Sequence, residues 1–344
     1  MDTDNILIID EAYCLKTINH IQTRDGIIFS TKSPFAETYI LKPIQEDTER
    51  KLFLYLVHTF LYQNGFTNID KILLTNQNSL TIEIDEQQYI LCKVQKGRQC
   101  SVENIQDIKF AAKTLADMHN CSVGFTTEIA EKIASAVQTE RKVPYIKFEL
   151  GGLQDLFEHR TRELARLKKV AIRRKNIFDY EYVAIADKYC NMANETCVAL
   201  RESKYSKLCR EYAKNGIICH KEYSPHNIIL LNETDAAIIN FDKASIDLPL
   251  FDIANLIKRY MKKNGWDASK GLEIINEYNK TRNISNDELN IIKIMLAFPQ
   301  KLWRIVNKYY NSRRAWCEKS CLLKLSEIKK ESEEIEKFLK DFTF

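Results

Sequence analysis

The amino-acid sequence predicts an α+β protein with two lobes, a small N-terminal lobe built on an antiparallel sheet and a larger C-terminal lobe that is mainly helical. Three observations support this prediction. Short apolar runs separated by turn-forming residues continue as far as Val94, helical periodicity dominates from Val102 onward, and a strand–turn–strand segment between Ile217 and Asp242 interrupts the helices. We therefore expect one lobe in residues 1–95 and the other in residues 96–344.

The composition is that of a globular protein long enough to bury a core in each lobe: of 344 residues, 45% are hydrophobic and 28% are charged. The net charge of +4 is too small to indicate nucleic-acid binding. The ten cysteines are scattered without a CxxC pair, and the N-terminus is acidic, unlike a secretory signal, so we expect reduced thiols and synthesis in the cytoplasm. No apolar run approaches the roughly 18 residues of a membrane span.

The chain begins with a short helix, expected around Ile9 to Lys16, and continues in antiparallel strands. The apolar runs Ile27–Phe29 and Thr38–Leu41 are separated by turn formers, and Lys42 follows the second run directly. A strand can simply end in lysine, but an ammonium group at this position could also bind a phosphate. Gly26 is the only glycine in these strands, so no GxGxxG motif covers the site.

An amphipathic helix is predicted from Glu46 to Asn64, and strands are predicted at 71–74, 79–84 and 88–94. Glu49 lies in the first turns of the helix, where the helix dipole alone explains an acidic residue. If Lys42 binds phosphate, Glu49 could instead be the carboxylate that positions it. Val94 ends the last strand and leads into a polar connector, whose backbone could meet an adenine edge in a hinge between the lobes.

The C-terminal lobe is predicted to be helical apart from its central segment. His119 ends the first helix of this lobe, where a capping or packing role is expected. A basic run covers residues 160–175, with Leu164 and Leu167 on one face and most of the cations on the other. Such a pattern favours a solvated helix face, with contact to an acidic partner or a phosphorylated ligand as the alternative.

The central segment presents polar side chains at the ends of short apolar strands. Glu222 follows the run Ile217–Cys219, Asn227 lies five residues later, and Asn240 and Asp242 follow a second apolar run. Phosphoryl transfer needs a carboxylate that orients the attacking hydroxyl, together with oxygen ligands for magnesium. Asp242 lies two residues after Asn240 along the predicted strand, so the two side chains are expected to share a face. Further on, Asp252 is placed to cap a helix.

The order of these parts resembles the aminoglycoside phosphotransferase and choline kinase group of kinase-like folds, and its details are most similar to bacterial spore coat proteins of the CotS type. The resemblance extends from about residue 5 to about residue 325. The closer match is carried by Cys219–Tyr223, Asn240–Ser245, Asp247-x-Pro249-x2-Asp252-Ile253, and Phe298-Pro299-x3-Trp303 with Tyr309, Tyr310 and Trp316.

This resemblance implies a nucleotide site on the N-terminal lobe. Lys42 matches the phosphate-contacting lysine, and Glu49 matches its helix partner. Val94 corresponds to the hinge that borders the nucleotide base. ATP and magnesium are accordingly the cofactors that the resemblance implies.

The same resemblance assigns the central segment to catalysis and metal binding, with two departures. Glu222 stands where the family has the catalytic aspartate. The glutamate side chain is one methylene longer, which displaces its carboxylate, and a displacement of about 1 Å can cost on the order of a hundredfold in rate. Asn227 matches a metal-binding asparagine, but Asn240 replaces the anionic metal ligand by a neutral one, and Asp242 is the carboxylate that could substitute. Asp252 matches the buried aspartate that braces the catalytic loop.

Three hypotheses about function follow from the resemblance and its departures. The first is a spore coat protein with a degenerate phosphotransferase site, a pseudokinase that acts in coat structure or assembly. It would be made in the mother-cell cytoplasm, move to the spore coat, and have other coat proteins as partners. The alternative is an active ATP- and magnesium-dependent phosphotransferase acting on a small hydroxylated molecule or a coat protein. A scaffold that binds ATP without turnover is a third hypothesis.

Overall fold

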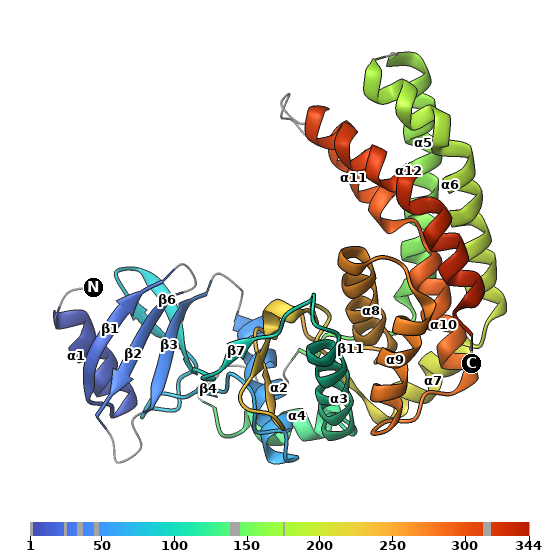
Figure 1. The fold of residues 1–344 in the computed structure, drawn as a ribbon. Coiled ribbons are helices and arrows are strands. Elements are labelled where there is room, and N and C mark those ends of the chain that lie inside the picture. The colour runs from blue at the N-terminus through green and yellow to red at the C-terminus, as the bar shows by residue number, and fades with distance from the viewer. Residues whose placement is uncertain are drawn as a thin grey trace.

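A computed structural model describes residues 3–23, 26–32, 37–44, 48–137, 145–174, 176–311 and 318–343 of the chain. Trp316, one of the aromatic residues that carry the resemblance, lies outside the described residues. An antiparallel sheet with flanking helices comes first, followed by a larger helical part that carries short strands (Figure 1). The predicted fold class is therefore confirmed. The boundary at residue 95 stays a prediction.

The N-terminal sheet is antiparallel, with the strand order β1-β2-β3-β6-β4 and with β5 paired to β6. Its strands are β1 (Thr17–Gln22), β2 (Ile27–Thr31), β3 (Thr38–Pro43), β4 (Ile72–Leu73), β5 (Ile82–Ile84) and β6 (Gln87–Lys93). Strand β3 lies between β2 and β6, and its register places Lys42 opposite Ile90. Lys42 therefore comes from a strand that is held on both sides.

A helix covers each face of this sheet. Because neighbouring side chains of a strand alternate between faces, Leu41 packs in the cluster of Ile9 and Tyr13 of α1 (Thr3–Tyr13). Lys42 points to the opposite face, beside His58 of α2 (Thr48–Gln63). Helix α1 begins earlier than the sequence suggested and ends at Tyr13. Its buried stripe includes Ile9 and Tyr13, which lie four residues apart on one face of the helix.

A short connector joins the sheet to the helical part. It leads from Val94 into β7 (Arg98–Gln99), which pairs with β9 (Ile228–Leu230). Gly97 approaches that strand closely, because a Cβ atom at this position would lie 2.2 Å from the Leu230 carbonyl oxygen. The connector and the central segment are thus packed against each other.

Helices build most of the remaining chain. They are α3 (Ile105–Cys121), α4 (Thr127–Ala134), α5 (Gly152–Arg174), α6 (Ile177–Glu202), α7 (Tyr205–Asn215), α8 (Leu250–Asn264), α9 (Ala268–Asn279), α10 (Asn286–Ala297), α11 (Gln300–Asn311) and α12 (Glu318–Asp341). Helices α5, α6, α11 and α12 extend together, away from the N-terminal sheet (Figure 1). Among the described helices, none combines the length and the apolar character that crossing a membrane requires.

Tyr309 and Tyr310, two of the aromatic residues that carry the resemblance, pack between helices. The ring of Tyr309 stacks on Phe178 of α6 with 3.8 Å between centroids. Tyr310 donates a hydrogen bond to the Asp179 carboxylate in the first turn of the same helix. Both tyrosines therefore join α11 to α6 inside the protein.

The strands of the central segment form two short antiparallel pairs. Strand β8 (Ile218–Cys219) pairs with β11 (Ser245–Ile246), and β9 pairs with β10 (Ala236–Ile238). A 3-10 turn, Pro225–Asn227, leads into β9. We call residues 220–227, between β8 and β9, the central loop.

Candidate functional site

Asp252 fixes the start of the central loop. It was expected to cap helix α8, but Pro249 occupies the N-cap position and no side chain caps it. The two carboxylate oxygens of Asp252 instead accept hydrogen bonds of 2.7 Å from the backbone N–H groups of His220 and Lys221. The cap prediction is wrong because these loop donors, brought by the tertiary fold, take the carboxylate. Asp252 braces the loop.

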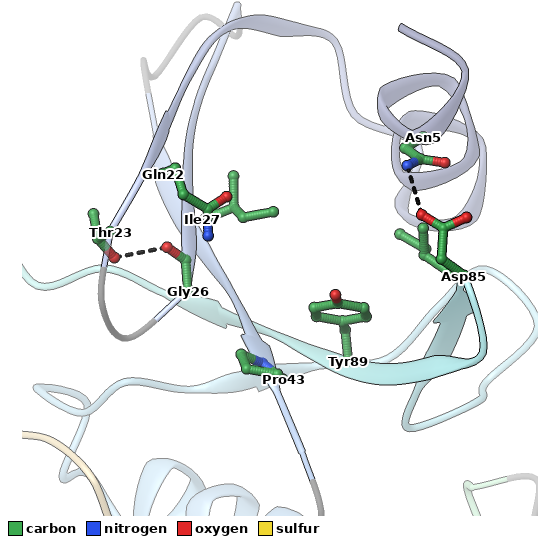
Figure 2. A pocket seen from close by; sticks show the side chains of 9 residues that line it. Asn5, Gln22, Thr23, Gly26, Ile27, Pro43, Asp85 and Tyr89 are labelled. Carbon is green, nitrogen blue, oxygen red and sulfur yellow. Dashed lines mark hydrogen bonds between the residues drawn. The ribbon is translucent and has the colours of Figure 1, made fainter. Parts of the chain in front are cut away.

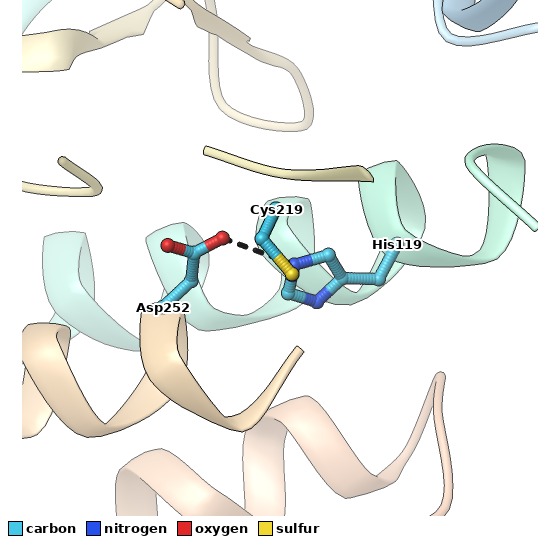
Figure 3. Close-up of side chains that lie close together, drawn as sticks. All are labelled: His119, Cys219 and Asp252. Carbon is cyan, nitrogen blue, oxygen red and sulfur yellow. Dashed lines mark hydrogen bonds and ion pairs between the residues drawn. The ribbon is translucent and has the colours of Figure 1, made fainter. Parts of the chain in front are cut away.

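A buried cluster of His119, Cys219 and Asp252 supports this brace (Figure 3). His119 Nε2 lies 3.3 Å from an Asp252 oxygen, and its Nδ1 lies 2.8 Å from the Tyr278 hydroxyl. Burial raises the pKa of the Cys219 thiol well above its usual range, and Cys219 donates to the Asp247 carbonyl at 3.2 Å. Each of the three side chains already has a hydrogen-bond partner within the protein, so the cluster acts as part of the brace.

Lys42 lies between two acceptors. Its Nζ atom is 2.9 Å from Asp70 Oδ2 and 2.9 Å from Asn240 Oδ1. Burial alone would lower the pKa of Lys42, but the charge of Asp70 outweighs it and raises that pKa. Burial would likewise raise the pKa of Asp70, whose value is lowered by the charges of Lys42 and His58. The pair is therefore ionised in the folded protein.

Asp70 is a site residue that the sequence reasoning missed. Its only signal was one carboxylate between the apolar residues Ile69 and Ile72. Glu49 lies in the first turn of α2, as expected. Its role beside Lys42 stays a prediction, whereas the carboxylate that the structure places on the Lys42 ammonium is Asp70.

The side-chain amides of Asn240 and Asn227 continue the chain of contacts. An ammonium group only donates, so the atom of Asn240 that faces Lys42 is Oδ1, and Nδ2 faces Asn227. That Nδ2 donates to Asn227 Oδ1 at 3.0 Å. Asn227 Nδ2 in turn donates to the backbone carbonyl of Glu222 at 3.0 Å. The two amides thus bind each other where a metal ion was expected.

Asp242 and Glu222 differ from these residues because their side chains are exposed. Strand β10 ends at Ile238 and Asn240 has a φ of +63°, so the expected shared strand face of Asn240 and Asp242 does not exist. Asp242 lies in the following turn, where its charge still helps to raise the pKa of Lys42. Asp242 is therefore an exposed carboxylate whose charge reaches Lys42.

A magnesium ion does not fit this arrangement. Magnesium takes a near-octahedral shell of oxygen ligands that usually includes one or two carboxylates. Here the Oδ1 atoms of Asn240 and Asn227 already accept hydrogen bonds, and the Lys42 cation lies 2.9 Å from one of them.

Val94, the residue expected at the hinge, makes a backbone hydrogen bond within the protein. The backbone N–H of Val94 donates to the Thr38 carbonyl at 2.9 Å. An adenine edge would therefore have to use other backbone groups of the connector. The nucleotide-contacting role of Val94 stays a prediction.

A cavity of about 250 Å³ opens on the face of the sheet opposite to Lys42 (Figure 2). Its lining includes Pro43, which points away from the face of Lys42, and Tyr89, which pairs with Pro43 in the sheet. Asn5 of α1 bonds to Asp85 at its rim, with 3.2 Å between the atoms. Among the described residues, those that line this cavity include no cation, and Lys42, the residue expected to bind phosphate, lines a different cavity.

Comparison with known proteins agrees with this architecture. The chain is similar to spore coat protein S of Bacillus subtilis (strain 168), with 22% identity over 282 residues, which cover 81% of this chain and 76% of that protein. The aminoglycoside phosphotransferase from Alicyclobacillus acidocaldarius superposes with a TM-score of 0.81 at 18% identity, covering 97% of this chain and 93% of the other. This likeness confirms the kinase-like fold.

AMP-bound spectinomycin phosphotransferase has the same fold at a TM-score of 0.58 and 14% identity, covering 98% of this chain and 97% of its own. The model of one family matches residues 7–342, which is nearly the whole chain. The protein with this braced central loop and amide-linked lysine belongs to the family described as spore coat putative kinase YutH.

Proposed function

We propose that the protein is a spore coat component whose kinase-like site has little or no phosphotransferase activity, and that it acts in the structure or assembly of the coat. The observation that carries this proposal is the side-chain amide of Asn240, which links Lys42 to Asn227. In a phosphotransferase the corresponding groups would face the nucleotide and its metal. In this protein they are bonded to one another.

The charge of the site supports this proposal. Asn240 is neutral, and the nearby carboxylate of Asp70 is buried in its pair with Lys42. A hard dication loses a full charge of attraction when an anionic ligand becomes an amide. The remaining carboxylates, Glu222 and Asp242, are exposed and lie outside the amide chain. Magnesium binding is therefore expected to be weak.

The family supports the place of action. A protein of a spore coat family is expected in the mother-cell cytoplasm first and in the spore coat later, with other coat proteins as its partners. Fractionation of sporulating and vegetative cells tests this. Detection only during sporulation, in the spore surface fraction, is the expected result. Equal amounts in vegetative cytoplasm would contradict the coat role.

Nucleotide binding is tested by thermal unfolding with ATP, with and without magnesium. A ligand that binds only the folded state raises the melting temperature. We expect magnesium to cause no rise in the melting temperature of either the wild type or Lys42→Met. A rise without magnesium that Lys42→Met abolishes would instead indicate a scaffold that binds ATP without turnover.

The alternative is an active ATP- and magnesium-dependent phosphotransferase whose acceptor is a small hydroxylated molecule or a coat protein. One observation favours it: the charge of Asp242 acts on Lys42, so a carboxylate is within electrostatic reach of the site. In this case Glu222 would orient the acceptor, and Asn227 and Asp242 would hold the metal. Phosphate release from ATP that Glu222→Ala abolishes would overturn the proposed pseudokinase.

A further inference from the structure

Three cations from three different helices are near enough in the helical part for their charges to act on one another. They are Arg160 of α5, Lys258 of α8 and Arg304 of α11. Burial and the charges of Arg304 and Arg160 lower the pKa of Lys258 to about 8. Burial and Arg304 likewise lower the pKa of Arg160. Lys258 and Arg160 are half-buried and Arg304 is exposed, so solvent reaches the cluster from one side.

The side chain of Arg160 is held in place, but one of its hydrogen-bond donors has no acceptor. Its guanidinium stacks on Trp303 of α11, 4.2 Å from the ring centroid, and donates a hydrogen bond to Gln300. Its Nε atom is buried and has no hydrogen-bond partner. Glu163 is the carboxylate that acts on Arg160, and it accepts a 2.7 Å hydrogen bond from Trp303 Nε1. The cluster therefore keeps an excess of about two positive charges.

The cluster lies on the same side of α8 as the central loop. Phe251 and Lys258 are seven residues apart, which is close to two helical turns, so their side chains share a face about 10 Å apart along the axis. The ammonium of Lys221 lies 3.8 Å from the centroid of the Phe251 ring. Lys221 directly precedes Glu222 in the central loop. One face of α8 thus connects the loop to the cations.

We propose that Arg160, Lys258 and Arg304 form a subsite for a phosphate group on a ligand that lies along this face of α8 toward the central loop. A phosphate carries a charge of about −1.5 to −2 at neutral pH, which matches the excess charge of the cluster. Arginine offers a planar fork of donors and lysine a mobile ammonium, and both groups bind phosphate oxygens. The subsite extends the proposed function by defining the class of ligand, and it requires no phosphoryl transfer.

The test is titration of the full chain with inorganic pyrophosphate at constant ionic strength, with binding measured by calorimetry and by tryptophan emission. Tryptophan emission is a suitable readout because Arg160 stacks on Trp303. Lys258→Met and Arg304→Gln should each weaken binding by roughly tenfold or more, because each removes a charged donor. Arg166→Gln, which removes an exposed cation of α5, is the matched control and should bind as the wild type does.

Lys42→Met separates this subsite from the nucleotide position. Pyrophosphate binding that survives Lys42→Met and is lost in Lys258→Met and Arg304→Gln supports the subsite, whether or not the protein turns over ATP. Arg304 is exposed, so Arg304→Gln is expected to fold and its melting temperature shows whether it does. Unchanged affinity in both variants, absence of binding to the wild type, or equal loss in Arg166→Gln would overturn the proposal.

Discussion

The side-chain oxygen of Asn240 accepts a hydrogen bond of 2.9 Å from the Lys42 ammonium. This contact joins residues that are 198 positions apart, one on the N-terminal sheet and one behind the central loop. Asn240 also donates its backbone N–H to Asp70 at 3.1 Å, so the same segment contacts the sheet side twice. The site is thereby closed by its own polar groups.

Replacing Asn240 by aspartate should create magnesium dependence. In Asn240→Asp, a carboxylate oxygen would replace the Nδ2 donor that lies 3.0 Å from Asn227 Oδ1, leaving two acceptors face to face. Without metal, we expect a loss of about 1 kcal/mol in the free energy of unfolding from the missing hydrogen bond. With ATP and magnesium, we expect a melting temperature above that with ATP alone, because the metal satisfies both oxygens.

The control for this substitution is Asn240→Ala, which removes the hydrogen bond to Asn227, and also the one from Lys42, but adds no charge. It should lose stability without gaining any response to magnesium. If Asn240→Asp responds to magnesium no more than Asn240→Ala does, the identity of residue 240 does not limit metal binding. The geometry of the loop would then be the cause of the absent metal binding.

Acid should destabilise the protein through His58. Burial, together with the charges of Lys42 and His220, lowers the pKa of His58 to about 4 from an unfolded value of 6.5. Between these values the unfolded chain binds more protons, so the free energy of unfolding should fall by roughly 3 kcal/mol from pH 7 to pH 4. The carboxylate of Asp70, whose pKa is lowered, keeps its contribution until the pH falls further.

Urea unfolding at a series of pH values measures this slope. His119 is also buried with a lowered pKa, so it adds to the same slope. His58→Phe keeps the ring that meets Phe241 edge-on and should flatten the profile between pH 6.5 and 4. His159→Gln, which replaces an exposed histidine, is the control substitution with which His58→Phe is compared. An unchanged slope in His58→Phe would contradict the assignment.

Local sequence patterns predicted the elements of the fold and some of the site. Alternating and helical periodicity defined the sheet and α2, and the position of Lys42 at the end of an apolar run placed it on β3. The spacing of Glu222 and Asn227 indicated a loop between short strands. These features depend on neighbours in sequence, which is why one chain is enough to predict them.

Contacts between distant segments could not be predicted in this way. Asp70 is 28 residues from Lys42 in the sequence. Asp70 becomes the partner of the Lys42 ammonium because the segment before β4 packs beside β3 and beside Asn240. Asp252 has the sequence context of a helix cap, but its hydrogen bonds go to loop donors about 30 residues away. The positive φ of Asn240 likewise removed the strand face that was expected.

Removing the brace should destabilise the fold regardless of any catalytic role. In Asp252→Ala, the N–H groups of His220 and Lys221 lose their buried acceptors, and His119 loses one of its two partners. We expect a loss of about 3–5 kcal/mol in the free energy of unfolding, typical of a broken buried charged network. Asp267→Ala, which removes an exposed N-cap carboxylate of α9, should cost about 1 kcal/mol. Equal losses in the two variants would refute the brace.

Lys221 holds the central loop in a strained conformation, and two substitutions at this position should differ in stability. Its φ is +68°, in the left-handed region that glycine adopts without strain, and its ammonium contacts Asp247 and, at 2.9 Å, Glu149. Both Lys221→Met and Lys221→Gly leave the Asp247 carboxylate, which is 1% exposed, without its cation, at a cost of about 3 kcal/mol.

Only Lys221→Gly also relieves the backbone, by about 1 kcal/mol, so it should be the more stable of the two in urea unfolding. Adding Asp247→Asn removes the uncompensated charge, and it should recover part of the loss in both backgrounds by a similar amount. If Lys221→Met is as stable as Lys221→Gly, the backbone at residue 221 stores no strain. If Asp247→Asn recovers nothing, the ion pair does not stabilise the loop.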